Sequence, residues 1–247
     1  MIMGFNHDDK SDGSGKAGIT FIFTDDVAKQ NMCEKSSMDS LFQEIQDKGS
    51  ATLSWEDTSL HTWLTDSFTD QLPSELSDKI VAVNKTDTVM PLTTSTVFDG
   101  REEFPTADID MGSDPKTVTS SDKLWLPSYV EIASPDDTGL DDLGYSSYLL
   151  QEGSQYQLFK DAGVKLGEPN KILGTYDSEQ GGWWLRTWSI YEPARYEPAR
   201  GSTLNPNFKA TYSDGDGEAA RCGDRALACS YNKDGDPVIG VRPAFCI

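Results

Sequence analysis

Apolar residues recur at helical spacing in two places near the start of the chain. One helix is predicted over 37–47, with Gly49 marking its end. A second helix is predicted over 56–72, with an N-cap available at Asp57 or Thr58. The two apolar stripes consist of Met38, Leu41, Phe42 and Ile45, and of Leu60, Trp63, Leu64 and Phe68.

Short apolar blocks bounded by polar or turn residues predict strands elsewhere. These blocks lie at 19–24, 51–55, 80–84, 123–127, 183–187 and 240–245. Short helical turns are expected at 74–79 and 129–132. The end of another helix is expected at 156–162, with Tyr156, Phe159 and Lys160 around its surface. Residues 86–121 are mostly Thr, Ser, Asp, Gly and Pro, which predicts a long surface excursion.

A polar stretch near the C-terminus lies between two apolar framing strands. Residues 187–235 are rich in Tyr, Arg, Asn, Asp and Gly and cannot supply a core of their own, so we interpret them as presented loops. Within them the sequence Tyr-Glu-Pro-Ala-Arg occurs twice in succession, at 191–195 and 196–200. Prolines at this spacing exclude a regular helix or a central strand, so the duplication should bulge into solvent. A hairpin turn is expected at 232–236.

The composition of this stretch favours a binding surface. Tyr and Arg provide contact area and hydrogen-bonding tips, while Asn, Ser and Gly adapt locally. The candidate ligand-binding residues are Trp188, Tyr191, Arg195, Tyr196, Arg200, Asn205, Asn207, Tyr212, Arg221 and Tyr231. The alternative is that some of them, especially Trp188 and Tyr231, pack against the sheet.

Charge and size restrict the class of protein. The 247 residues include 41 Asp and Glu against 21 Lys and Arg, a formal net charge of -20, which disfavours binding to nucleic acid and to anionic membrane surfaces. Hydrophobic residues make up 36%, enough for the core of one domain spanning 1–247. No apolar run approaches the roughly 18 residues of a membrane helix, and no export signal is recognised. We therefore expect a domain excised from a longer extracellular protein.

Metal and cofactor sites are not expected. The cysteines lack C-x-x-C spacing and neither His7 nor His61 lies near one in sequence, which disfavours zinc. For His61 we expect a packing or surface role. An acidic loop at 135–142 could hold calcium, but a solvated loop is the commoner explanation.

The four cysteines leave two alternatives open. Cys222 could pair with Cys229, and Cys33 with Cys246. Equally, all four could be buried thiols of a reduced protein. There is no G-x-S-x-G elbow, phosphate-binding glycine loop or H-E-x-x-H motif, so no catalytic residue is assigned and no enzyme activity is expected.

Five motifs carry a resemblance to a family of bacterial domains of unknown function, found largely in surface proteins of gut bacteria. They are Gly-Ile-Thr-Phe at 18–21, Ser-Trp-Glu-Asp at 54–57 running into Leu-His-Thr-Trp-Leu at 60–64, Asp-Lys-Leu-Trp-Leu-Pro-Ser at 122–128, Trp-Trp-Leu-Arg at 183–186, and Gly-Val-Arg-Pro-Ala at 240–244.

The last motif also resembles the closing strand of the C-type-lectin-like fold, in the branch of formylglycine-generating enzymes and of the variable proteins of diversity-generating retroelements. Val241 stands where that fold usually has an aromatic residue. The resemblance implies an α+β domain with N-terminal helices, long loops and a small twisted antiparallel sheet, whose terminal strand pairs back near the N-terminal strand. The scaffold would be 18–186 and 236–247, and 187–235 would be the ligand-facing surface.

We therefore expect a non-catalytic recognition domain that binds a protein or glycan. The resemblance implies a bacterial cell surface or a phage tail, and a segment that could be diversified. The alternative is a formylglycine-type oxidase using Cys222 and Cys229, although the sequence around them lacks the arginine- and glycine-rich strand of those enzymes. A third possibility is a structural module that only spaces other domains.

Overall fold

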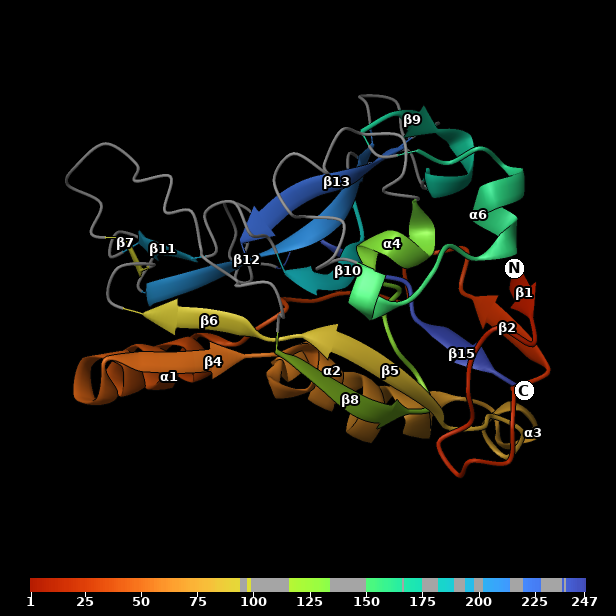
Figure 1. Ribbon diagram of the computed structural model, residues 1–247, viewed down its shortest axis with the longest axis horizontal. Helices are drawn as coiled ribbons and strands as arrows, with labels where there is room; N and C mark the ends of the chain where they lie inside the picture. Colours follow the sequence, from red (N-terminus) through yellow and green to blue (C-terminus); the bar gives the residue numbers. More distant parts are fainter. Residues whose placement is uncertain are drawn as a thin grey trace.

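The computed structural model describes residues 1–93, 97–98, 116–133, 150–165, 167–174, 182–188, 194–197, 202–213, 220–227, 237 and 239–247. They form a mixed α and β structure built from several small, mostly antiparallel sheets (Figure 1). The expected α+β class is confirmed at this level.

Helical elements lie mostly in the first third of the chain. They are α1 (Lys35–Lys48), η1 (Trp55–Asp57), α2 (Ser59–Thr62), the π-helical turn η2 (Trp63–Phe68), η3 (Thr69–Gln71), α3 (Ser74–Ser77), α4 (Tyr129–Ile132), η6 (Leu150–Glu152), α6 (Gln157–Asp161) and η7 (Lys171–Leu173).

The strands are distributed along the whole chain. They are β1 (Ile2–Phe5), β2 (Ile19–Ile22), β3 (Ala28–Lys29), β4 (Ser50–Leu53), β5 (Val83–Thr88), β6 (Met90–Thr93), β7 (Val97–Phe98), β8 (Thr117–Asp122), β9 (Pro169–Asn170), β10 (Trp184–Trp188), β11 (Ala194–Glu197), β12 (Ser202–Ser213), β13 (Ala220–Leu227), β14 (Gly240–Val241) and β15 (Ala244–Cys246).

The first predicted helix is confirmed and the second is interrupted. α1 ends at Gly49, whose φ of 80° is left-handed and whose N–H donates to the Ile45 carbonyl. The second stretch winds through η1, α2, η2 and η3 instead of forming one α-helix. Thr58 breaks it because its backbone is extended, and its hydroxyl then caps α2 by accepting from the His61 N–H.

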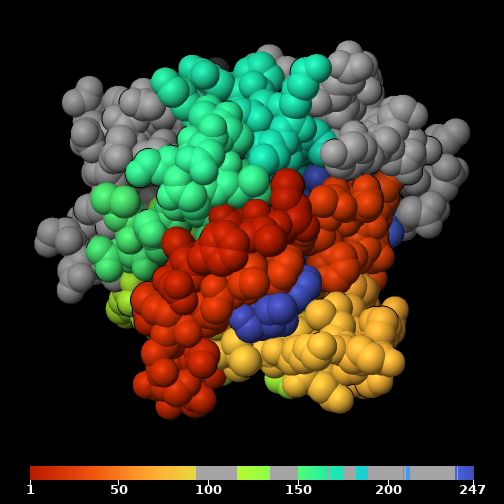
Figure 2. Space-filling model, turned by 90° about the vertical axis from the view of Figure 1, so that its right-hand side faces the viewer, coloured from red at the N-terminus to blue at the C-terminus, as the bar shows by residue number. Residues whose placement is uncertain are grey.

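The two ends of the chain meet in one sheet of order β1-β2-β15, all antiparallel. The Met1 amine donates to the Ile22 carbonyl over 2.7 Å, and the Ile19 N–H donates to the Ile247 carbonyl over 3.1 Å. In the space-filling view the C-terminal residues lie between the N-terminal segment and the helical residues that include α3 (Figure 2). The C-terminal strand β15 therefore pairs with β2, next to the N-terminal strand β1.

The expectation of a long surface excursion over 86–121 is wrong at both of its ends. β5 continues to Thr88 and pairs antiparallel with β8, and β6 pairs with β4. Met90 and Leu92 are fully buried, and Asp87 is 2% exposed. Alternating Thr and Asp concealed this strand because its buried positions are polar, the reverse of the usual pattern.

The presented segment is also more regular than expected. β12 and β13 form an antiparallel pair in a sheet of order β7-β11-β12-β13-β9, and β10 pairs with β12 beside it. Contrary to the sequence analysis, β11 is a central strand between β7 and β12. It fits because its four residues lie between Pro193 and Pro198, so neither proline occupies a position within the strand.

Aromatic residues dominate the core. Trp55, Trp125, Trp183 and Trp184 are at most 1% exposed. Tyr156 and Phe159 are equally buried, so their predicted position on the helix surface is wrong. Tyr156 directly precedes α6 and Phe159 lies within it, and α6 packs on β1. Cys246 is a buried thiol, which also rules out the Cys33–Cys246 disulfide.

Candidate functional site

Six of the ten residues predicted to bind a ligand lie on three neighbouring strands. Arg195 and Tyr196 are on β11, Asn205, Asn207 and Tyr212 on β12, and Arg221 on β13. The register places Arg195 opposite Asn205, and Tyr212 opposite Arg221. We call this sheet, β11-β12-β13, the recognition sheet.

The other four candidates have different positions. Trp188 ends β10, is 2% exposed and donates its indole N–H to the Thr88 carbonyl over 3.1 Å. Trp188 is therefore a buried residue that packs beneath the sheet, which is the alternative to ligand binding. Tyr191, Arg200 and Tyr231 lie outside the described residues, as do the acidic loop at 135–142 and the turn at 232–236.

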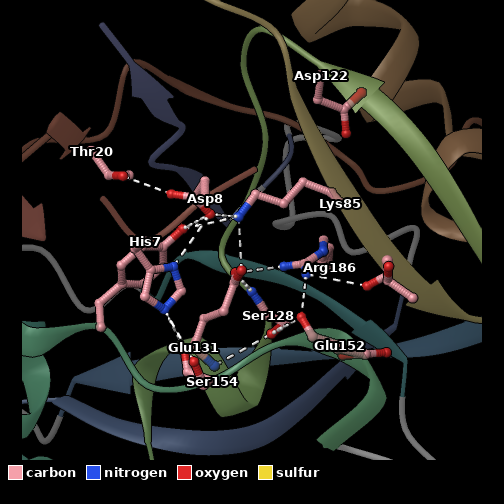
Figure 3. A network of polar contacts seen from close by, with 12 residues as sticks. His7, Asp8, Thr20, Lys85, Asp122, Ser128, Glu131, Glu152, Ser154 and Arg186 are labelled. Carbon is pink, nitrogen blue, oxygen red and sulfur yellow. Dashed lines mark hydrogen bonds and ion pairs between the residues drawn. The ribbon is translucent and has the colours of Figure 1, made fainter. Parts of the chain in front are cut away.

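A cluster of buried charges lies beneath β10, and the sequence analysis missed it (Figure 3). Its members come from β1–β2, β5, β8, α4, η6 and β10, and each is at most 5% exposed. We call it the buried ion cluster. It contains Asp8, Lys85, Asp87, Asp122, Glu131, Glu152 and Arg186.

Arg186 forms one centre of this cluster. Its guanidinium lies 2.7 Å from Glu131 Oε2, and it donates to the Glu152 carbonyl over 2.8 Å. Its Nε lies 2.7 Å from Asp87 Oδ1, but the geometry is wrong for a hydrogen bond, so this contact is purely electrostatic. A buried Arg between carboxylates is stable only while these partners remain.

Lys85 forms the other centre. Its ammonium contacts Asp8 Oδ1 at 2.5 Å, Glu131 Oε1 at 2.8 Å and the Tyr156 hydroxyl at 2.9 Å. Glu131 therefore joins the two cations. α4 holds Glu131 in place through a capping box, in which Ser128 and Glu131 satisfy each other's backbone N–H.

Five carboxyl groups share this cluster with two cations, and burial and the neighbouring charges shift the pKa values of several of them in opposite directions. Burial raises the pKa of Asp87 to about 7, although the charge of Arg186 lowers it. The charges of Glu152 and Asp122 add to the rise. Burial also raises the pKa of Glu152. For Glu131, Arg186 and Lys85 outweigh the effect of burial and lower the pKa. Asp87 is therefore a carboxyl able to hold a proton near neutrality, and the pKa of Glu152 shifts in the same direction.

His61 connects this cluster to the surface. Its Nε2 lies 2.8 Å from Asp122 Oδ1, and the Ser120 hydroxyl donates to the other oxygen of that carboxylate over 2.7 Å. Burial lowers the pKa of His61, but the hydrogen bond and charge of Asp122 outweigh it and raise the pKa overall. The His61 side chain is 16% exposed, so a packing role alone does not describe it.

Substrate access to the cluster is poor, because its charged side chains are fully enclosed. A separate cavity of about 60 Å³ lies beside β2, lined by Trp183, Arg242 and Phe159 among others. It has room for a small group only. Among the described residues, no group of His, Cys, Asp or Glu is arranged to hold a metal ion. None of the helices in the same part of the chain is long and apolar enough to cross a membrane.

The cysteines of the alternative enzyme are only partly placed. Cys222 lies on β13, with its Cα opposite Thr211 of β12. Cys229 falls beyond the described residues. Their role stays a prediction.

One signal in the sequence could have pointed to the buried ion cluster. Ser128 and Glu131 stand three residues apart after a proline, the pattern of a capping box. Nothing local identifies Lys85, Asp87 or Glu152, because their partners lie far away in sequence.

Comparison with known proteins gave one match. A family model described as Domain of unknown function (DUF6273) matches residues 17–247, nearly the whole chain. No curated protein and no solved structure matches it.

Proposed function

We propose that this chain, which belongs to the DUF6273 family, is a non-catalytic recognition domain that binds a protein or glycan through the recognition sheet and the connections around it. The observation that carries the proposal is the register of β11, β12 and β13. It places six residues of the Tyr, Arg and Asn type on adjacent strands of one sheet.

The length of the sheet supports an extended ligand. β12 runs over 12 residues, which corresponds to roughly 40 Å along an extended strand. A sheet of this length exceeds a small-molecule pocket and suits a protein surface or an oligosaccharide chain.

The scaffold beneath supports the same function. β12 packs on α1 and pairs with β10, whose five residues are all buried. Through Arg186, β10 is tied to the buried ion cluster. Such a base holds the recognition sheet rigidly, which lowers the entropic cost of binding.

The finer fold assignment belongs to this proposal as well. The pairing of β15 with β2, next to β1, supports the C-type-lectin-like fold that the sequence resemblance implies. With that fold we propose exposure on a bacterial cell surface or a phage tail, and a segment 187–235 open to diversification.

The test is a binding screen with a matched control. The purified domain is applied to a glycan microarray and to an array of purified extracellular proteins. A variant carrying Arg195→Ala, Tyr196→Ala, Tyr212→Ala and Arg221→Ala should bind the probes that the wild type retains with at least tenfold lower affinity. A control with Gln43→Ala, Asp47→Ala and Lys48→Ala, on the exposed side of α1, should keep them. Equal binding by both variants would contradict the proposal.

Two further measurements separate the alternatives. In copies of the gene from related strains, substitutions should concentrate in codons 187–235 if the surface is diversified. Replacing Cys222 and Cys229 by serine should leave probe binding unchanged, whereas an oxidase would depend on both thiols.

A further inference from the structure

The Lys85 ammonium group lies between two buried carboxylates. Asp8 Oδ1 and Glu131 Oε1 lie 2.5 and 2.8 Å from Nζ, and the three side chains are at most 3% exposed. They come from the segment after β1, from β5 and from α4, so only folding brings them together (Figure 3). The amine and the Asp8 carboxyl are therefore held at reacting distance with water excluded.

Aromatic rings lie beside the same ammonium group. The Lys85 ammonium lies 4.4 Å from the centre of the Trp125 ring and 5.5 Å from that of Tyr156. Both rings are fully buried. In such surroundings an ion pair loses the solvation that stabilises it in water. Attack by the amine requires transfer of one proton from the ammonium to the carboxylate, which gives a neutral amine beside a neutral acid.

We propose that Lys85 and Asp8 condense into an intramolecular isopeptide bond, with Glu131 as the proton carrier. Lys85 first passes a proton to the Asp8 carboxylate, which leaves a free amine and a carboxylic acid. Nζ then attacks Asp8 Cγ. Glu131 takes a proton from the nitrogen and returns it to the departing hydroxyl, so a C–N bond forms, a C–O bond breaks and one water leaves.

This step needs no oxidant or other reactant. The ammonium and the carboxylate together contain all atoms of the amide and the water, and the net charge does not change. Glu131 begins and ends as a carboxylate, and its Oε1 lies 2.8 Å from the nitrogen, within reach for proton transfer.

The hydrogen bonds distinguish Asp8 from Glu131 as the partner that reacts. Both Asp8 oxygens accept from hydroxyls, with Tyr156 at 2.8 Å and Thr20 at 2.6 Å. These donors can stabilise the negative charge that develops on the carboxyl oxygen during attack. Glu131 Oε2 is instead held by Arg186 and by the Ser128 N–H, which keep it ionised.

The bond would clamp the N-terminal segment onto β5. It stands apart from the recognition proposal, because neither Lys85 nor Asp8 lies on the recognition sheet. Its consequence is a loop of chain that stays closed in denaturant and under protease attack.

The deciding measurement is the intact mass of the folded wild-type protein, freshly purified and after several days at neutral pH. We expect the mass to fall below that of the sequence by one water molecule. Proteolytic mapping should then give a branched peptide joining the segments that contain Asp8 and Lys85. A folded protein that retains the full mass overturns the proposal.

Water can also be lost at an Asp-Gly step, which forms a succinimide, and Asp12-Gly13 is such a step. Hydroxylamine cleaves a succinimide and leaves an isopeptide bond intact. Loss of water mapped to Asp12, or to a Lys85–Glu131 link, therefore also overturns the proposal.

Variants supply the controls. Asp8→Ala should show the full mass, while Asp9→Asn, at the exposed neighbouring position, should show the same deficit as the wild type. Glu131→Gln should form the bond at least tenfold more slowly, with folding checked by circular dichroism. Full linkage in a folded Glu131→Gln protein would contradict the role of Glu131. If that variant does not fold, the wild-type mass and Asp8→Ala decide the question.

Discussion

The buried ion cluster and the recognition sheet are held in place by different means. In the cluster each charge depends on named side chains: Arg186 on Glu131 and Asp87, and Lys85 on Asp8. In the sheet, backbone register defines the positions of β11, β12 and β13. A backbone ladder accepts many side chains, whereas a buried ion pair accepts almost none. Substitutions should therefore be tolerated more readily in the sheet than in the cluster.

The largest effect should follow from removing Arg186. An Arg186→Met variant removes the cation beside Asp87 and Glu152 and one of the two cations beside Glu131, so we expect a loss of about 3–5 kcal/mol in the free energy of unfolding, measured by urea denaturation. Lys48→Met removes an exposed partner of Glu44 and should cost less than about 0.5 kcal/mol. Similar losses in the two variants would show that the cluster is not what holds the scaffold.

The second prediction concerns pH. The pKa of Asp87 is raised from 3.8 to about 7, so between these values the folded protein keeps a proton that the unfolded chain releases. Stability should therefore fall as pH rises through this window, with a limiting slope of about 1.4 kcal/mol per pH unit for one proton. His61, whose pKa is also raised, should add to the fall above its ordinary pKa of 6.5.

The matched variant for this prediction is Asp87→Asn, which is neutral at every pH. Urea denaturation at a series of pH values should show a flatter profile between pH 4 and 7 than in the wild type. Below that window Glu131, whose pKa is lowered chiefly by Arg186 against the effect of burial, should make stability rise with pH in both proteins. An unchanged slope in Asp87→Asn would assign the pH dependence to another group.

These long-range partners are what the sequence could not predict. α1 with its Gly49 cap, α4 and the buried strand at β10 follow from local spacing and were predicted correctly. The contacts of Arg186 with Asp87 and Glu131 join residues that lie far apart in the chain, and no periodicity encodes such a pair. Polar side chains at buried positions of β5 even reversed the signal, which led to the wrong prediction of a surface excursion.

The segment that contains the recognition sheet was singled out by its composition, but its strands were not predicted. Tyr, Arg and Asn marked the segment, and the strands within it were missed because few of its residues are apolar. Pairing with β10 and packing on α1 supply what the segment's own sequence lacks.

A smaller effect on stability is expected from a substitution at Gly240, in β14. A Cβ built there would lie 2.2 Å from Asp26 Oδ2, and Asp26 also accepts from Arg242 over 2.8 Å. We expect Gly240→Ala to cost about 1–3 kcal/mol in thermal or urea unfolding. Gly4→Ala, whose Cβ would meet Tyr156 at an ordinary 3.5 Å, should cost less. Equal costs would mean that Asp26 moves aside freely.

The smallest effect on stability should come from the recognition sheet itself. Arg195→Ala and Arg221→Ala should each change the free energy of unfolding by less than about 0.5 kcal/mol. Binding of the array probes is where their effect should be seen. A loss above 2 kcal/mol for either would place that side chain among the structural residues and weaken the comparison.

The sheet β1-β2-β15 also has a mechanical consequence. β1 and β15 both run antiparallel to β2, so they point the same way on its two sides. A force that pulls Met1 and Ile247 apart therefore slides both strands along β2 in opposite directions. In that geometry the hydrogen bonds of a ladder share the load instead of opening one at a time. A domain stretched between its two ends would therefore be loaded in shear and would resist the pull.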